Sequence, residues 1–278
     1  MEFKQDISIV LSGAAGQGIQ TIEFILTRLM KLSGFNVYAT KEYMSRVRGG
    51  SNSTLIRVSS KPVTAFSEKI DILIPLQKNA LQRLKKRITR ETLILCDSDF
   101  CSGDAEVNIL NVPIMETAVS SGNKIYSNTV AIGVVCGLFG LEPESLKSYL
   151  IKFFSGKPEK VIQENLTAAE KGIKLGSGLI EKNHIVIGIE RDKTVADDIL
   201  INGAEAIGFG SVAGGCNFIS SYPMSPSTGV LVFLSQNAER FGIIAEQAED
   251  EISAINMSLG ASYAGDRAMV TTSGGGFA

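Results

Sequence analysis

Residues 7 to 19 read Ile-Ser-Ile-Val-Leu-Ser-Gly-Ala-Ala-Gly-Gln-Gly-Ile. The apolar run from Ile7 to Leu11 predicts a buried strand, and the helical pattern from Ile19 to about Ser33 predicts the first helix. A glycine loop between the first strand and the first helix is typical of a doubly wound α/β sheet. We therefore predict an α/β fold that opens with a Rossmann-like, doubly wound domain.

The glycine loop is a weak indicator of a ligand. Backbone amides can approach an anion at Gly13, Gly16 and Gly18, beside the start of the helix. The spacing is Gly-x-x-Gly-x-Gly rather than Gly-x-Gly-x-x-Gly, so a tight turn without a ligand is at least as consistent. An acidic residue for a ribose is expected near the end of the second strand, but Glu42 comes late, which disfavours an NAD site.

The chain around this loop alternates between strands and helices, which favours a mostly parallel sheet. Strands are predicted at 35–39, 54–59, 70–76 and 93–96, and helices at 79–88, from 128 to 139, from 141 onward and from 158 to about 174. The glycine-containing stretch 172–187 predicts a linker. We place the first domain at 1–185 and a second domain at 190–278.

Between two of the strands, Arg46 and Arg48 precede Gly49-Gly50, and they can bind a phosphate or carboxylate or pair with nearby acids.

The second domain contains a stiff loop, Ile-Ser-Ser-Tyr-Pro-Met-Ser-Pro-Ser-Thr, at residues 219–228. Pro223 and Pro226 exclude a helix there and push the residues before them toward an extended shape. Ser227 or Thr228 can then cap the helix that we predict from residue 230 to 241. A hydroxyl-rich loop held in this way suits a binding site, although a Pro-punctuated surface turn is the default interpretation.

A strand at 243–245 is followed by a group of acids, Glu246, Glu249, Asp250 and Glu251, and then by a helix with Ile252, Ile255, Asn256 and Leu259 on one face. A carboxylate at such a strand-to-helix junction is either an N-terminal helix cap or a working acid. Chemistry alone favours the cap.

Composition excludes several classes of function. The 278 residues carry a formal net charge of −2 and no dense basic run, which argues against nucleic-acid binding. No apolar run reaches the roughly 18 residues of a membrane span, and no signal peptide is visible, so we expect a cytoplasmic protein. Cys96, Cys101, Cys136 and Cys216 are scattered without a Cys-x-x-Cys pair, which argues against a zinc or iron–sulfur site and favours buried or idle thiols in a reducing compartment.

The motifs of both halves resemble the 2-oxoacid:ferredoxin oxidoreductases. Residues 221–228 resemble that family's Tyr-Pro-Ile-Thr-Pro-Ser-Thr signature, and 249–252, 260–265 and 272–277 look like the rest of its pyrimidine-binding domain for thiamine diphosphate. Gly13 to Gly18, Arg48-Gly49-Gly50 and Asn128 to Gly133 resemble its gamma domain. The resemblance implies an alpha subunit with gamma, residues 1–185, fused at its N-terminus. A second domain of roughly 80 residues is too short to close its own core, so we expect it to be an incomplete pyrimidine-binding domain and the chain to be truncated at its C-terminus.

The resemblance also assigns residues. Glu251 would be the carboxylate on the pyrimidine N1′ of thiamine diphosphate, with Glu249 as the alternative. Ser225, where the family usually has threonine, would meet the substrate carboxylate. Tyr222, Pro223 and Thr228 would shape the pocket. Gly16, Gly18 and Arg48 carry over from a domain associated with coenzyme A, although they could equally form an assembly surface.

The cofactors and partners follow from the same resemblance. A beta subunit would hold Mg²⁺ and a [4Fe-4S] cluster and pass electrons to ferredoxin, since this chain has no matching motif. The fused gamma domain favours 2-oxoglutarate, with pyruvate and branched-chain oxoacids still open. The alternatives are a nucleotide-binding Rossmann module and a non-catalytic assembly subunit.

Overall fold

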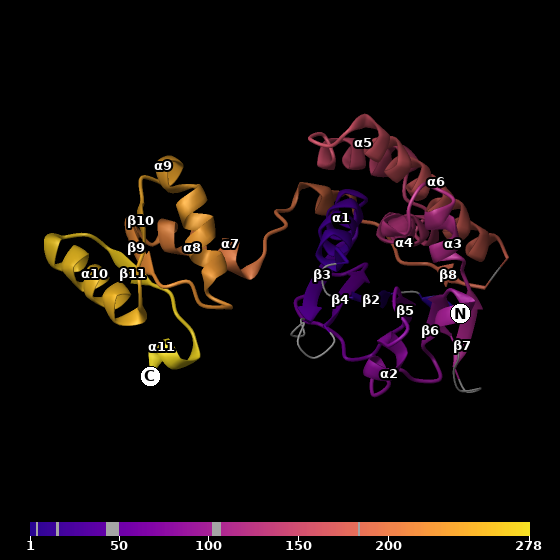
Figure 1. Cartoon of the computed structure of the whole chain (residues 1–278), viewed down its shortest axis with the longest axis horizontal. Coiled ribbons are helices and arrows are strands. Elements are labelled where there is room, and N and C mark those ends of the chain that lie inside the picture. Colours follow the sequence, from indigo (N-terminus) through magenta and orange to yellow (C-terminus); the bar gives the residue numbers. More distant parts are fainter. Residues whose placement is uncertain (4, 15–16, 43–49, 102–106, 183) are drawn as a thin grey trace. The chain divides into compact units, whose positions relative to one another are not determined.

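The computed structural model describes residues 1–278 with the exception of residues 4, 15–16, 43–49, 102–106 and 183 (Figure 1). The chain forms two compact units, unit 1 from Met1 to Asp198 and unit 2 from Ile199 to Ala278. Within the described residues, no helix has the length and apolar character needed to cross a membrane.

Unit 1 is built on a six-stranded sheet with the strand order β3-β4-β2-β5-β6-β7. Its strands are β2 (Asp6–Ala14), β3 (Asn36–Glu42), β4 (Ser51–Ser59), β5 (Ile72–Pro75), β6 (Leu93–Cys96) and β7 (Asn108–Asn111). β4 runs antiparallel to both of its neighbours, whereas β2, β5, β6 and β7 pair in parallel. The predicted α/β fold with a mostly parallel sheet is confirmed. A separate two-stranded pair, β1 (Glu2–Phe3) and β8 (Val186–Ile187), joins the first residues to the end of this unit.

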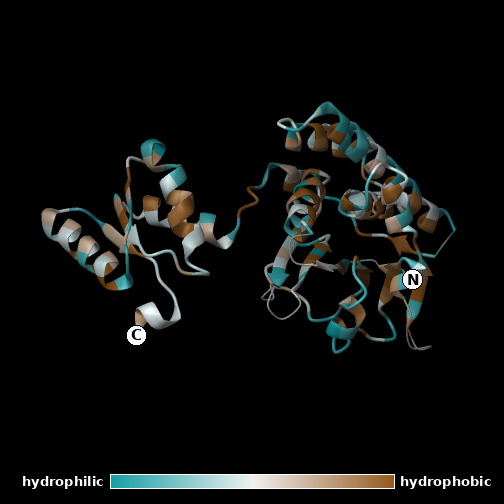
Figure 2. Cartoon of the chain, in the orientation of Figure 1, coloured by the Kyte–Doolittle hydropathy of each residue, from teal (hydrophilic) through white to brown (hydrophobic). Residues whose placement is uncertain are grey.

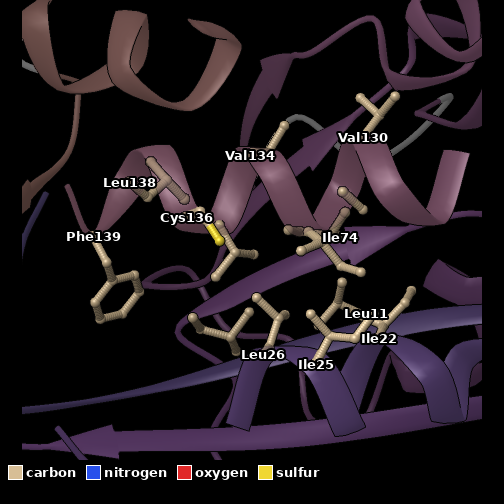
Figure 3. Packing of buried hydrophobic residues seen from close by; sticks show 14 of the residues in the cluster. Leu11, Ile22, Ile25, Leu26, Ile74, Val130, Val134, Cys136, Leu138 and Phe139 are labelled. Atoms are coloured by element: carbon tan, nitrogen blue, oxygen red, sulfur yellow. The ribbon is translucent and has the colours of Figure 1, made fainter. Parts of the chain in front are cut away.

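The helices of unit 1 cover both faces of the sheet. They are α1 (Ile19–Leu32), α2 (Ala80–Leu84), α3 (Ile114–Val119), α4 (Ser127–Leu138), α5 (Pro143–Phe153) and α6 (Glu159–Glu181). Side chains alternate along a strand, so Ile9 and Leu11 of β2 join the main core while Val10 joins a smaller cluster with Leu84 of α2 on the other face. In the main core, residues of α1 and α4 meet over Leu11 and Ile74 of the sheet (Figure 3). The exposed helices show brown and teal residues side by side, as amphipathic helices do (Figure 2).

Glycines bring α4 and α6 into close contact. A Cβ atom on Gly176 would lie 2.1 Å from the Val134 carbonyl oxygen, and one on Gly137 would lie 2.3 Å from the Ile173 carbonyl oxygen. Gly133 and Gly172 repeat this arrangement one turn away. The glycines that suggested a linker from residue 172 are therefore part of a helix crossing, and α6 runs to Glu181 instead of ending near Lys174.

The cysteines differ from the prediction in one respect. Cys96 and Cys101 are paired as a disulfide, while Cys136 and Cys216 are free and buried. The prediction of idle thiols is therefore wrong for the first two, because the turn after β6 brings two residues separated by five positions together. Burial raises the pKa of the Cys136 thiol to about 12, so this thiol stays protonated and unreactive.

Unit 2 contains a three-stranded parallel sheet with the order β10-β9-β11. Its strands are β9 (Phe218–Ser221), β10 (Ile244–Gln247) and β11 (Ala268–Val270), and its helices are α7 (Gly203–Ala213), α8 (Thr228–Gln236), α9 (Ala238–Phe241), α10 (Glu251–Ala264) and α11 (Gly274–Phe277). A capping box formed by Asn202 and Glu205 starts α7. The core is small and centres on Ile219 and Leu234. α10 leaves Ile252 and Tyr263 largely exposed.

We predict that Gly176→Ala destabilises unit 1 by about 1 to 3 kcal/mol, since the added methyl group would overlap the backbone of α4. Gly178→Ala is the matched control on the same helix, because a Cβ atom there meets no atom within 4 Å. The control should gain roughly 0.5 to 1 kcal/mol from helix propensity. Urea unfolding followed by circular dichroism measures both, and equal effects of the two substitutions would contradict the close crossing.

Candidate functional site

The candidate site of unit 2 lies where β9 and β11 end and where α10 begins. Because the two strands are parallel neighbours, their carboxyl ends meet at one edge of the sheet, the usual position for ligands in open α/β sheets. A cavity of about 470 Å³ opens there. Its lining residues are Tyr222, Glu251, Ile252, Ala254, Ile255, Val270, Thr271, Thr272, Gly276 and Phe277.

The loop between β9 and α8 carries the two prolines. α8 begins at Thr228, two residues earlier than predicted, and Ser227 occupies the position before it. The Ser227 hydroxyl does not cap the helix but donates to the Met224 carbonyl oxygen at 2.7 Å. The Met224 carbonyl oxygen also accepts from the Thr228 backbone N–H at 3.1 Å, so the loop is tied to the first residue of α8.

Asp250 is the helix cap among the acids at the start of α10. Its carboxylate accepts a hydrogen bond from the Ser253 backbone N–H at 2.6 Å. Glu251 is then the first residue of the helix, half-buried at the cavity wall, and its carboxylate is not engaged by another described residue. Asp250 therefore satisfies the backbone at the start of α10, and the Glu251 carboxylate remains available to a ligand in the cavity.

Hydroxyl groups fasten the edges of the cavity. Ser221 Oγ and Thr271 Oγ1 lie 2.7 Å apart, and Ser221 Oγ also accepts from the Thr271 backbone N–H. Ser273 Oγ donates to the Ser225 carbonyl oxygen at 3.0 Å, which ties the proline loop to the segment after β11. Deeper in the unit, Ser220 Oγ lies 2.7 Å from Ser258 Oγ and so joins β9 to α10.

The side chains of Glu251 and Thr272 meet against Gly276. A Cβ atom built on Gly276 would lie 2.3 Å from Glu251 Cγ and 2.3 Å from Thr272 Oγ1. Thr272 Oγ1 is buried and has no hydrogen-bond partner among the described residues. The cavity therefore holds a carboxylate and an unpaired hydroxyl beside a position where only hydrogen fits.

The residues predicted from sequence fall into two groups. Glu251 and Tyr222 line the cavity together, and Pro223 follows directly. Ser225 and Glu249 are exposed, and Thr228 is half-buried at the start of α8. These three are not among the lining residues in the described part of the chain. Thr272 and Gly276 have no role predicted from the sequence, although both lie in the motif at 272–277.

In unit 1 the glycine loop ends at the start of α1. Gly18 occupies the position before the helix with φ +81°, a left-handed conformation that favours glycine. Asn128, at the start of α4, donates its side-chain amide to the Gln17 carbonyl oxygen, and a Cβ atom on Gly18 would lie 2.9 Å from that amide nitrogen. Gly16 and Arg48 lie outside the described residues, so their predicted roles stay predictions.

Two family models match the chain. One, described as pyruvate ferredoxin/flavodoxin oxidoreductase, matches residues 8–175. The other, described as the thiamine diphosphate-binding part of pyruvate flavodoxin/ferredoxin oxidoreductase, matches residues 210–278. The first lies within unit 1 and the second within unit 2.

Individual relatives agree with these matches. The alpha subunit of 2-oxoacid:ferredoxin oxidoreductase from Sulfolobus sp is 23% identical, over 98% of this chain and 50% of the relative. The 2-oxoglutarate synthase subunit KorC of Archaeoglobus fulgidus is 27% identical over 61% of this chain and 84% of that protein. The solved 2-oxoglutarate:ferredoxin oxidoreductase from Magnetococcus marinus, with 2-oxoglutarate, coenzyme A and succinyl-CoA bound, superposes with a TM-score of 0.87 at 29% identity, over 99% of this chain and 48% of that one. The chain thus spans about half the length of the relatives that match nearly all of it.

Replacing the helix cap tests which of the two acids, Asp250 or Glu251, caps α10. We predict that Asp250→Ala lowers the free energy of unfolding by about 1 kcal/mol, since the Ser253 N–H loses its acceptor. Asp250→Asn keeps an acceptor and should stay within roughly 0.5 kcal/mol of the parent. Glu251→Ala should cost less than Asp250→Ala in the same thermal unfolding experiment. The reverse order would mean that Glu251 is the cap.

Proposed function

The chain belongs to the pyruvate ferredoxin/flavodoxin oxidoreductase family, and we propose that it is a subunit of a 2-oxoacid:ferredoxin oxidoreductase that works with thiamine diphosphate. The observation that carries this proposal is the Glu251 carboxylate, which lines a cavity and is not used as a helix cap. It lies within the segment that matches the thiamine diphosphate-binding family model.

The cavity suits the pyrimidine half of this cofactor. Ile252, Ile255 and Val270 give it apolar walls for a flat ring. Glu251 and the unpaired hydroxyl of Thr272 supply polar groups for a ring edge that carries nitrogen atoms. Gly276 keeps the space beside both side chains free.

Each site residue predicted in unit 2 then has a defined role. When bound, thiamine diphosphate supplies the electron sink for decarboxylation of a 2-oxoacid. Glu251 would hold the proton shared with the N1′ nitrogen of the pyrimidine ring, and Tyr222 would cover one side of the ring. The Ser225 hydroxyl would bind the substrate carboxylate, supported by the hydrogen bond that its own carbonyl accepts from Ser273. Pro223 and Thr228 would fix the two ends of this loop, and Glu249 is the alternative to Glu251.

The substrate and the partners are the finer part of the proposal. The names of the Archaeoglobus and Magnetococcus relatives favour 2-oxoglutarate, with coenzyme A as the acyl acceptor. The turn at Gly18 and the start of α1 support a coenzyme A contact in unit 1 because backbone amides point outward at a helix start. A beta subunit would carry Mg²⁺ and the [4Fe-4S] cluster and deliver electrons to ferredoxin.

We predict that Glu251→Gln abolishes turnover, with a loss of about 100-fold or more, because the amide cannot exchange a proton with the ring. The assay is viologen reduction by the complex with its beta-type subunit, given thiamine diphosphate, coenzyme A and either 2-oxoglutarate, pyruvate or 2-oxoisovalerate. Glu249→Gln is the matched control, since Glu249 is exposed and does not line the cavity. It should keep activity within about threefold of wild type.

The outcomes separate the competing assignments. Loss of activity in Glu249→Gln alone would move the catalytic role to that residue. A complex that holds cofactor and cluster yet reduces no acceptor with any of the three oxoacids would favour a non-catalytic assembly subunit.

We predict that Ser225→Ala raises the KM for the oxoacid about tenfold with a smaller change in kcat, since a hydrogen bond to a charged carboxylate is lost. Ser225→Thr retains the hydroxyl and should restore most of the affinity. Steady-state kinetics with the preferred oxoacid measure both. Equal KM values for the alanine and threonine variants would remove Ser225 from the substrate site.

A further inference from the structure

Three consecutive hydroxyl residues follow β11, and their hydrogen bonding differs. Thr271 is held by Ser221, and Ser273 is held by the Ser225 carbonyl oxygen. Thr272, between them, has a buried hydroxyl without a partner in the described part of the chain. Both neighbours are thus tied to the segment 221–225, whereas the Thr272 hydroxyl is left without a described partner.

An unpaired buried hydroxyl is unfavourable in a folded protein, and it commonly marks a place where a ligand or a moving side chain supplies the missing bond. The nearest candidate in the cavity is the Glu251 carboxylate. Glu251 Oε1 and Thr272 Oγ1 both lie within 2.8 Å of the position that a Cβ atom on Gly276 would occupy. The two oxygen atoms therefore border the same space, and a side-chain rotation can bring them into hydrogen-bonding distance.

We propose that Thr272 is a positioning residue that donates its hydroxyl hydrogen to the Glu251 carboxylate when an aminopyrimidine ring occupies the cavity, and that Gly276 leaves the space in which this contact forms. The inference rests on the proposed function. An ionised carboxylate offers lone pairs on two oxygens. One oxygen faces the ring nitrogen, and the other accepts from Thr272.

Gly276 is the second part of this arrangement. A methyl group at this position would lie 2.3 Å from Glu251 Cγ and from Thr272 Oγ1, so it would drive the two side chains apart. A methyl group on the preceding residue, Gly275, would meet no atom within 4 Å, which makes that position the natural comparison. The space occupied by neighbouring side chains therefore requires glycine at 276 but not at 275.

The test is the affinity for thiamine diphosphate, measured by calorimetry with Mg²⁺ on the complex with the beta-type subunit. Thr272→Val should weaken binding about tenfold, and Thr272→Ser should bind within about threefold of wild type. In a Glu251→Ala background, which removes the acceptor, Thr272→Val should have little further effect, because the hydroxyl acts through the carboxylate. Gly276→Ala should weaken binding, whereas Gly275→Ala should not.

The unliganded chain gives a second, independent readout. Since the Thr272 hydroxyl has no partner among the described residues, Thr272→Val should leave Tm unchanged or raise it. A lower Tm for Thr272→Val, rescued by Thr272→Ser, would show a purely structural hydroxyl and overturn the inference. Wild-type binding that Thr272→Val leaves unchanged would overturn this inference alone. Absence of binding by the wild-type complex would overturn the proposed function itself and the inference with it.

Discussion

The hydrogen bond from the Ser253 backbone N–H to the Asp250 carboxylate decides where α10 begins, and the rest of the site depends on that position. Because Asp250 satisfies the exposed amide, Glu251 becomes the first helical residue and enters the cavity wall. The positive end of the helix dipole lies at the same place and favours a carboxylate there. A shift of the cap by one residue would commit Glu251 to the backbone and would leave Asp250 at a different angle.

The cavity is otherwise held by hydroxyl groups and glycine, not by a large core. Unit 2 has a three-stranded sheet and a small apolar cluster. Much of the cavity is therefore held in place by hydrogen bonds between the pairs Ser221–Thr271, Ser225–Ser273 and Ser220–Ser258. Short hydroxyl side chains lose little conformational entropy when they are fixed. They therefore hold a loop at modest cost, and they leave Thr272 as an unpaired group beside the carboxylate within the described structure.

Local pattern predicted much of the fold, and contacts between distant residues account for the differences. The strand at 93–96 and the buried helix from residue 128 could be predicted because their apolar runs are continuous. The end of α6 could not, since Gly172 and Gly176 signal a linker until they are seen against Gly133 and Gly137. In the site, the motif around Glu251 indicated a functional acid, but only the backbone geometry separates it from the cap at Asp250. The importance of Gly276 depends on two side chains that are close only in the folded unit.

The most direct test of this account is a crystal structure of the complex with thiamine diphosphate bound. We predict that a Glu251 carboxylate oxygen lies within hydrogen-bonding distance, roughly 2.6 to 3.2 Å, of the pyrimidine N1′ nitrogen, with the Thr272 hydroxyl on the other oxygen. A pyrimidine ring bound away from this cavity, or a Glu251 side chain turned to solvent while another acid contacts the ring, would contradict it.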